Sequence, residues 1–146
     1  MHKIAIGWDP NAVAIKDSLV TLLKERRYTV DELGSDDPIY ANSAIKVAEA
    51  VANGDYDRGV LLCGTGIGMS IAANKVRGAY AALIPDVYSA KRARMSNDAN
   101  IACFGAFTQG SKLIEELALT FLTSEFDQGG SSQPKVERYR QYDQNR

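Results

Sequence analysis

Cysteine and histidine are scarce in this chain of 146 residues, which contains two cysteines and one histidine. Cys63 and Cys103 lie far apart in the sequence and form no C-x-x-C pair, so a disulfide framework is not indicated. We therefore expect both cysteines to be free thiols. The one histidine, His2, stands at the start of the first apolar segment.

Neither an excess of basic charge nor a long apolar segment is present. Lysine and arginine total 17 against 18 acidic residues, so the composition does not favour binding to the phosphate backbone of nucleic acid. The N-terminal segment lacks the features of a signal peptide, and no apolar run is long enough to span a membrane. We therefore expect a soluble, cytoplasmic protein with no nucleic-acid or membrane partner, whose anionic ligands are small molecules.

Short apolar segments alternate with amphipathic ones along the chain. This alternation predicts parallel strands joined by right-handed crossovers, with helices on both faces of one sheet. The length fits a single domain, 1–146, of the doubly wound α/β class. Strands are predicted over 3–8, 28–34, 58–64, 78–85 and 100–107; helices are predicted around Ile15–Leu23, over 42–54 with Asn42 or Ser43 as cap and Gly54 as terminator, and over 69–76, 87–97 and 110–126.

The C-terminal segment 127–146 differs from the rest of the chain because it is polar and ends in a charged, helical-looking stretch. It is too short to be a domain, and it offers few apolar side chains for burial on its own subunit. We therefore predict that this tail contacts a neighbouring subunit.

The candidate site lies beyond the carboxyl ends of the predicted strands, where doubly wound sheets bind their ligands. Asp9 and Pro10 follow the first strand, Asp86 follows the fourth, and 105–108 follow the fifth. The third strand ends at Cys63 and continues into a loop with glycine at every second position, which comprises Gly64, Gly66 and Gly68.

Alternating glycines between a strand and a helix let backbone N–H groups approach an anion, and the helix N-terminus adds partial positive charge. The same environment favours the thiolate of Cys63, the form that acts as a base or nucleophile. Two plainer interpretations stay open at this point. The glycines can serve only a tight turn, and Cys63 can be a small buried apolar residue.

Nucleotide binding is a minor alternative. A P-loop requires Gly-Lys followed by Ser or Thr, but Gly68 is followed by Met69 and Ser70. The dinucleotide pattern G-x-G-x-x-G is not met either, although Asp86 lies about where that motif places its ribose-binding acid.

Several segments together resemble one enzyme family. They are "IAIGWD", "DRGVLLCGTGIGMSIAANKV", "GAYAAL", "DVYSAKRARMSNDAN" and "FGAFTQG". They are similar to the type B ribose-5-phosphate isomerase and galactose-6-phosphate isomerase family over essentially the whole chain. The resemblance implies a Rossmann-like three-layer αβα sandwich with a five-stranded parallel sheet. It also implies a metal-free, cofactor-free aldose–ketose isomerase of sugar phosphates, which is a homodimer or tetramer with active sites shared between subunits.

By this resemblance, Cys63 is the base that moves a proton between C1 and C2 of the sugar through an enediolate. A proton next to a carbonyl is weakly acidic, so the developing oxyanion needs preorganised donors, each contributing roughly 3 kcal/mol. The other residues implied are Thr65 and the amides of Gly64, Gly66, Ile67 and Gly68 around the oxyanion, Asp9 on the sugar hydroxyls with Pro10 beside it, Tyr40 lining the site, and Asn97 from the partner subunit.

The chain departs from the family pattern at its histidines and arginines. Pro10 and Ser96 stand where the family has histidine, so no histidine is predicted to open a sugar ring. Phe107 and Ser131 stand where it has phosphate-binding arginines. Lys135 or Arg138 is therefore the expected phosphate ligand.

The missing histidine suggests a substrate that never closes a ring. A tetrose 4-phosphate such as erythrose or erythrulose 4-phosphate qualifies, because its O4 is esterified. The alternatives are ribose 5-phosphate with ribulose 5-phosphate, or galactose 6-phosphate. An inactive partner subunit is a further alternative, against which the intact Cys63 and Thr65 argue.

Overall fold

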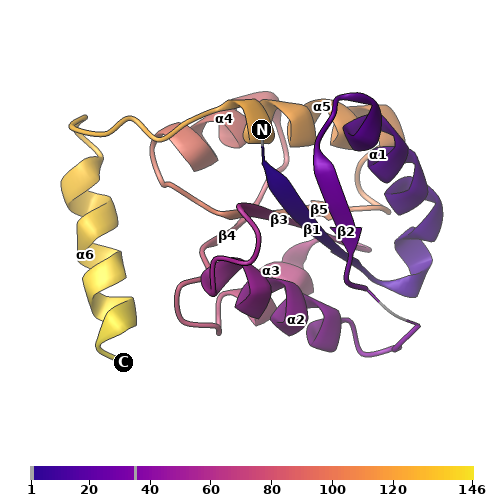
Figure 1. Cartoon of the computed structure of the whole chain (residues 1–146), viewed down its shortest axis with the longest axis horizontal. Coiled ribbons are helices and arrows are strands. Elements are labelled where there is room, and N and C mark those ends of the chain that lie inside the picture. Colours follow the sequence, from indigo (N-terminus) through magenta and orange to yellow (C-terminus); the bar gives the residue numbers. More distant parts are fainter. Residues whose placement is uncertain (1, 35) are drawn as a thin grey trace.

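The computed structural model describes residues 2–34 and 36–146, in which five parallel strands form one sheet between two layers of helices (Figure 1). The strands lie in the order β2-β1-β3-β5-β4, and every pair of neighbours is parallel. This arrangement confirms the predicted sandwich. The strands are β1 (Lys3–Trp8), β2 (Thr29–Glu32), β3 (Arg58–Cys63), β4 (Ala81–Leu83) and β5 (Ile101–Gly105).

The helices cover both faces of the sheet, as right-handed crossovers require. In Figure 1, α1, α4 and α5 lie on one face, whereas α2 and α3 lie on the other. The helices are the 3₁₀ turn η1 (Pro10–Ala12), α1 (Val13–Glu25), α2 (Tyr40–Ala52), α3 (Ile67–Ala73), α4 (Val87–Met95), α5 (Ser111–Thr123) and α6 (Gln133–Gln144). Among the described residues, no helix is both long and apolar enough to cross a bilayer.

The buried strand residues alternate between two apolar clusters, one on each face. Val60 and Leu62 of β3 belong to the cluster under α1, α4 and α5. Leu61 and Cys63 belong to the cluster under α2 and α3. This period of two explains why the central strands are apolar throughout, because both of their faces are buried. It also directs the side chain of Cys63 toward α2 and α3.

Several predicted boundaries differ from the structure by a few residues, and two of these differences have a visible cause. Helix α2 begins at Tyr40, so Asn42 and Ser43 are helical residues and neither is its cap. The reason lies in the preceding turn, where the Asp37 carboxylate accepts the Ile39 N–H at 2.8 Å and the Asn42 side-chain amide at 2.7 Å. The predicted end is confirmed, because Gly54 adopts a φ of 84° just beyond the helix.

Strand β4 is also shorter than predicted, since its ladder covers only Ala81–Leu83. The backbone N–H of Tyr80 donates to the Asn100 side chain at 2.8 Å. On the open edge of the strand, the Asn74 amide bonds both the N–H and the carbonyl of Ala81, at 2.8 and 2.9 Å. Side-chain amides therefore replace ladder hydrogen bonds around this edge strand.

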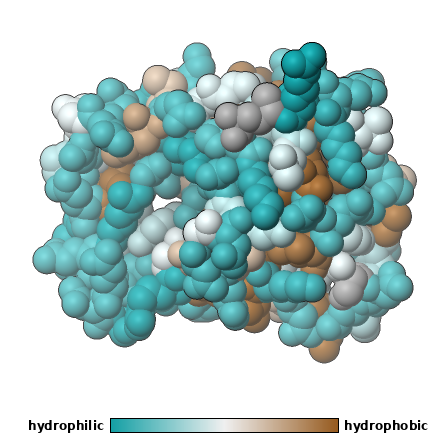
Figure 2. Space-filling model, in the orientation of Figure 1, coloured by the Kyte–Doolittle hydropathy of each residue, from teal (hydrophilic) through white to brown (hydrophobic). Residues whose placement is uncertain are grey.

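Helix α6 of the tail stands beside the α/β body (Figure 1), and Figure 2 shows a hollow between the two. Val136 is buried, and Asp143 accepts hydrogen bonds of 2.8 Å from the Gly78 N–H and the Tyr80 hydroxyl. Burial raises the pKa of Asp143, but hydrogen bonds from Gly78, Tyr80 and Arg146 outweigh it and hold that pKa below its usual value. The tail thus docks on its own subunit mainly through polar contacts; its contact with a neighbour stays a prediction.

Candidate active site

The sheet register brings the ends of β1, β3 and β5 together. Trp8 pairs with Leu62, and Cys63 pairs with Gly105. One residue beyond β1, the backbone N–H of Asp9 donates to the Leu62 carbonyl at 2.7 Å. Asp9 and Cys63 therefore lie side by side at the carboxyl edge of the sheet, as the sequence predicts.

The sulfur of Cys63 is held against the loop that follows it. The Gly66 N–H donates to the Cys63 Sγ at 3.1 Å, and Cys63 is only 6% exposed. A backbone N–H directed at sulfur stabilises a thiolate more than a neutral thiol. The loop is fixed in turn to the segment after β5, because the Ala106 and Phe107 N–H groups donate to the Cys63 and Gly64 carbonyls at 2.7 and 2.9 Å.

Close packing of backbones explains two glycines. Gly66 has a φ of 81°, and a Cβ added there would lie 2.7 Å from Leu83 Cδ1 and 3.0 Å from the Phe104 carbonyl carbon. A Cβ at Gly105 would lie 2.8 Å from the Thr65 Cα. The loop therefore rests directly on the end of β5, and only glycine allows this approach.

Aromatic rings explain the other two loop glycines. A Cβ at Gly68 would lie 2.1 Å from the Tyr40 hydroxyl oxygen, and one at Gly64 would lie 2.8 Å from Phe107 Cδ2. Tyr40 thus lies against the glycine loop; its contact with a substrate stays a prediction. Phe107 also flanks the loop although its ring is 72% exposed. The sequence analysis noted Phe107 only because it stands where the family has an arginine. The structure shows in addition that its ring occupies the space a side chain at position 64 would need.

The side chains of Thr65 and Asp9 each accept a hydrogen bond from a backbone N–H two residues further along the chain. The Thr65 Oγ1 accepts from Ile67 at 3.2 Å, and the Asp9 carboxylate accepts from Asn11 at 3.2 Å. Pro10 is exposed and begins the turn η1. Because the Gly66 and Ile67 amides have acceptors within the loop, a substrate oxygen would have to replace these acceptors. The amide cradle therefore stays a prediction.

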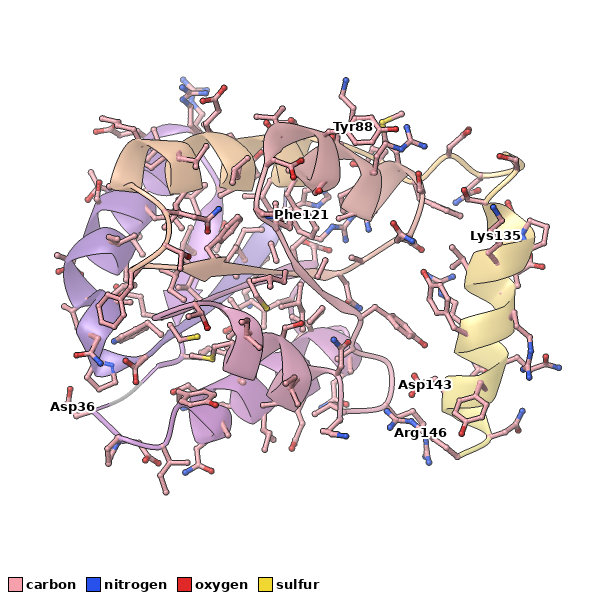
Figure 3. All side chains as sticks on the ribbon, turned by 180° about the vertical axis from the view of Figure 1, so that it is seen from behind. Asp36, Tyr88, Phe121, Lys135, Asp143 and Arg146 are labelled. Atoms are coloured by element: carbon pink, nitrogen blue, oxygen red, sulfur yellow. The ribbon has the colours of Figure 1, made fainter. Side chains whose placement is uncertain are left out.

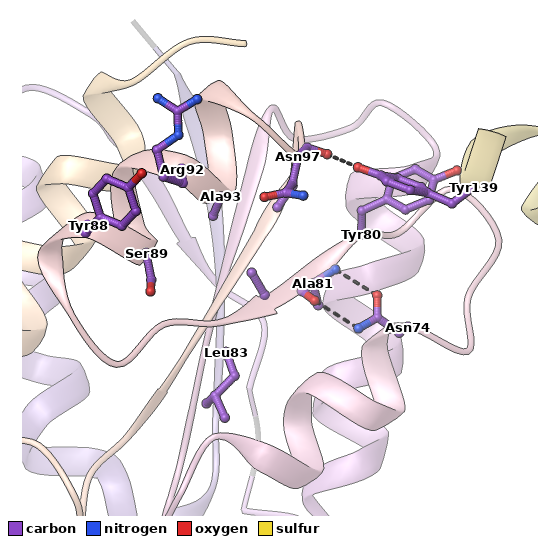
Figure 4. A pocket seen from close by; sticks show the side chains of 12 residues that line it. Asn74, Tyr80, Ala81, Leu83, Tyr88, Ser89, Arg92, Ala93, Asn97 and Tyr139 are labelled. Atoms are coloured by element: carbon purple, nitrogen blue, oxygen red, sulfur yellow. Dashed lines mark hydrogen bonds between the residues drawn. The ribbon is translucent and has the colours of Figure 1, made fainter. Parts of the chain in front are cut away.

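Asn97 lies at the opposite edge of the sheet. Helix α4 starts at the carboxyl edge, where Asp86 caps it by accepting the Ser89 N–H at 2.7 Å, and it ends close to the start of β5. Asn97 follows this helix and lines a cavity of about 470 Å³ together with Tyr88, Arg92 and Tyr139 (Figure 4). A single subunit therefore does not bring Asn97 to Cys63.

The predicted phosphate ligands are also remote from Cys63. Lys135 and Arg138 are exposed on α6, and neither lines the cavity around Asn97. Lys135 lies at the start of that helix, far from Asp143 and Arg146 at its other end (Figure 3). Arg92 and Tyr139, which do line the cavity, were missed because no local pattern distinguishes them from surface residues of a helix.

A second cavity, of about 330 Å³, lies beside the glycine loop. Thr65 and Thr108 contribute hydroxyl groups to a mainly apolar lining, which also includes Ile67, Leu83, Ile84, Pro85, Gln109 and Leu113. Within the described residues, no group of three or more His, Cys, Asp or Glu side chains is placed to hold a metal ion.

Cys103 differs from Cys63 in its surroundings. It lies in the middle of β5 with no exposed surface. Burial, followed by the nearby Cys63, raises the pKa of the Cys103 thiol. Cys103 is therefore a neutral core residue, and Cys63 is the candidate base.

Comparison with protein families matches residues 4–139 to the family described as Ribose/Galactose Isomerase. The chain belongs to the ribose/galactose isomerase family. The resemblance noted in the sequence is thereby confirmed, and so is the reaction class: the chain is a sugar-phosphate aldose–ketose isomerase, which is an intramolecular oxidoreductase.

Relatives within the ribose/galactose isomerase family are named for different substrates. The chain is 49% identical to "Ribose-5-P isomerase B" of Listeria innocua, with 97% of each chain covered. It is 44% identical to "D-erythrulose-4-phosphate isomerase" of Pectobacterium atrosepticum, covering 98% of this chain and 96% of that one. The solved structure of ribose-5-phosphate isomerase B from Mycoplasma genitalium, with bound ribulose-5-phosphate, is 31% identical with a TM-score of 0.92 and covers 99% of this chain and 97% of that one.

Replacing Gly66 with alanine should lower both stability and activity. The added Cβ meets Leu83 and the Phe104 backbone at a left-handed φ, which should cost about 1–3 kcal/mol of unfolding free energy. Because the Gly66 N–H holds the Cys63 sulfur, kcat should fall as well. Thermal unfolding and steady-state kinetics measure the two effects.

The matched control is Gly110→Ala, since Gly110 has a φ of −75° and no heavy atom within 4 Å of an added Cβ. It should leave kcat unchanged and lower the stability less than Gly66→Ala does, because its only cost is that alanine is a poorer N-cap for α5 than glycine. If Gly66→Ala and Gly110→Ala had the same thermal stability and the same kcat, the proposed role of Gly66 in holding the loop and the Cys63 sulfur would be contradicted.

Proposed function

We propose that this chain interconverts the aldose and ketose forms of a short sugar phosphate through an enediolate, with Cys63 as the base. The observation that supports this most is the Cys63 sulfur at the carboxyl edge, 3.1 Å from the Gly66 amide nitrogen and next to Asp9. A base, hydrogen-bond donors and an acceptor for sugar hydroxyls thus lie within one loop cluster.

The reaction needs no redox partner. In the aldose-to-ketose direction the Cys63 thiolate removes the proton from C2, and the electron pair moves toward the carbonyl so that O1 becomes an oxyanion. The proton then returns to C1, while O2 loses a proton and O1 gains one, so C2 is oxidised and C1 reduced in one molecule. Donors at the oxyanion, which we assign to Thr65 and the loop amides, contribute roughly 3 kcal/mol each.

The complete site is proposed to include residues of a second subunit. The segments that follow the five strands, 9–12, 33–40, 64–68, 84–87 and 106–110, contain no lysine or arginine. Lys16, over the Trp8 ring, is buried and paired with Glu32 at 2.5 Å and Asp17 at 2.6 Å. A sugar phosphate at this edge therefore requires cations from elsewhere, and Lys135 or Arg138 of a neighbour, arriving with Asn97, would supply them.

Two substrates have separate support. Ribose 5-phosphate is favoured by the 49% identical Listeria relative and by the ligand of the Mycoplasma structure. An open-chain tetrose phosphate is favoured by the 44% identical relative and by the position of the only histidine. His2 lies at the amino end of β1, 3.5 Å from the Glu125 carboxylate, and so lies away from Cys63 of its own subunit.

Replacing Cys63 with alanine should reduce kcat by orders of magnitude without unfolding the protein, because the variant loses the base but little buried volume. Exchange of deuterium from heavy water into C1 or C2, followed by NMR, reports the proton transfer directly. Cys103→Ala is the control and should retain turnover. If Cys103→Ala abolished turnover while Cys63→Ala retained it, Cys103 and not Cys63 would be the base.

Mixing Cys63→Ala subunits with Asn97→Ala subunits should regenerate activity, because one of the two sites in a mixed dimer would contain both native residues. The comparison is each variant alone at the same total concentration. Subunit exchange is verified by native mass spectrometry of differently labelled chains. No recovery in a verified mixture would argue that each site is built within one subunit.

The ratio of kcat/KM for erythrose 4-phosphate over ribose 5-phosphate should exceed one. Ring opening of the pentose requires a proton to move between the anomeric hydroxyl and the ring oxygen, and histidine suits this task near neutral pH. Galactose 6-phosphate completes the panel. A ratio below one would establish ribose 5-phosphate as the preferred substrate and assign ring opening to another group, such as Asp9.

A further inference from the structure

The turn that carries Asn97 has an unusual backbone. Asp98, the next residue, adopts a φ of 52°, a left-handed conformation that residues other than glycine seldom take. Such a conformation persists when the surrounding contacts determine it. The contacts here come from two directions, from α4 and from the tail.

From α4, the buried Arg94 holds the turn from inside. Its Nη1 donates to Asp98 Oδ1 at 2.8 Å and to the Ala99 carbonyl at 2.7 Å. Arg94 is only 3% exposed, so these charge-assisted bonds are shielded from water. They fix Asp98 and Ala99, but they do not reach Asn97.

From α6, two neighbouring residues hold the outside of the same turn. The Tyr139 hydroxyl donates to the Asn97 carbonyl (Figure 4), and the Arg140 guanidinium binds the Asp98 carboxylate. The Asp98 carboxylate is therefore shared between an arginine of α4 and an arginine of the tail. The tail supplies the contact to Asn97 that Arg94 does not.

Tyr139 is itself fixed in place. Its ring lies 5.7 Å from the Tyr80 ring, centroid to centroid, and the Tyr80 hydroxyl donates to Asp143 one helical turn further along α6. Burial, followed by the hydrogen bond with Asp143, raises the pKa of Tyr80 to about 12, so this hydroxyl remains a donor at neutral pH. The helix is thus held at two points, and the position of the Tyr139 hydroxyl is determined.

We propose that Tyr139 is a positioning residue that sets the orientation of Asn97 for the active site of a neighbouring subunit. The inference rests on the proposed shared site. Asn97 is exposed, and its side chain faces the cavity that Tyr139 also lines (Figure 4). The Asn97 backbone is held from two sides, because its N–H donates to the Arg92 carbonyl at 3.2 Å and its carbonyl accepts from the Tyr139 hydroxyl. Tyr139 therefore helps to fix the point from which the Asn97 side chain leaves the turn. The tail then serves its own subunit's Asn97 and, through it, the neighbour's Cys63.

A double-mutant cycle tests this role. Tyr139→Phe removes only the hydroxyl and keeps the ring against Tyr80, so it should lower kcat/KM about fivefold, the equivalent of one hydrogen bond. In the Asn97→Ala background, the same change should have no further effect on kcat/KM, because the side chain that it orients is gone. The thermal midpoint serves as the second readout, since a structural loss should lower it equally in both backgrounds.

Tyr142→Phe is the matched control, because Tyr142 lies on the same helix and is 64% exposed. It should leave kcat/KM unchanged. If Asn97→Ala alone has no effect, the shared site itself is refuted and this inference with it. If Asn97→Ala lowers activity but Tyr139→Phe does not, or if Tyr139→Phe costs the same factor in both backgrounds, only the positioning role is overturned.

Discussion

The close approach of the loop after β3 to the end of β5 is the constraint on which the candidate site depends. The backbone of Thr65 lies so near Gly105 that neither Gly105 nor Gly66 can carry a side chain without displacing its neighbours. This contact sets the direction of the Gly66 N–H, which holds the Cys63 sulfur at 3.1 Å. It is formed only because β3 and β5 are adjacent and parallel, although α3, β4 and α4 separate them in the sequence.

In the proposed shared site, the two edges of the sheet provide complementary groups. The carboxyl edge provides a thiol, a hydroxyl and backbone donors, but its connecting segments carry no cationic side chain. The amino edge and the tail carry Asn97, Arg92 and the exposed Lys135 and Arg138. Because the second set lies at the amino edge of the sheet and on α6, no rotation of a side chain can bring it to Cys63 within a subunit. This separation is the physical argument for our proposal that a second copy completes the site and places a cation next to Cys63.

Much of the fold can be predicted from hydrophobic periodicity and from helix-terminating glycine in the sequence. Contacts between segments that are distant in the sequence cannot be predicted in this way. The apolar strands and Gly54 were found because their signals are local. The start of α2 was missed because no side chain caps this helix, and the turn before it is closed by the Asp37 carboxylate, which accepts from the Ile39 N–H and the Asn42 side chain. The alternating glycines mark the candidate site in the sequence, but the sequence does not show that two of them make room for the rings of Tyr40 and Phe107. The polar tail was expected to find little on its own subunit, yet charged and hydroxyl groups dock it there.

The two thiols illustrate how position, and not residue type, decides chemistry in this sheet. Cys63 and Cys103 lie on neighbouring strands and belong to the same buried cluster, with Cys103 opposite Leu61 in the register. Two residues further along β3, the sheet ends and the Gly66 N–H donates to the sulfur of Cys63. At Cys103, burial, followed by the nearby Cys63, raises the pKa of the thiol and favours its neutral form. Of the two cysteines, only Cys63 therefore lies at the carboxyl edge beside the glycine loop, where we propose that the substrate binds.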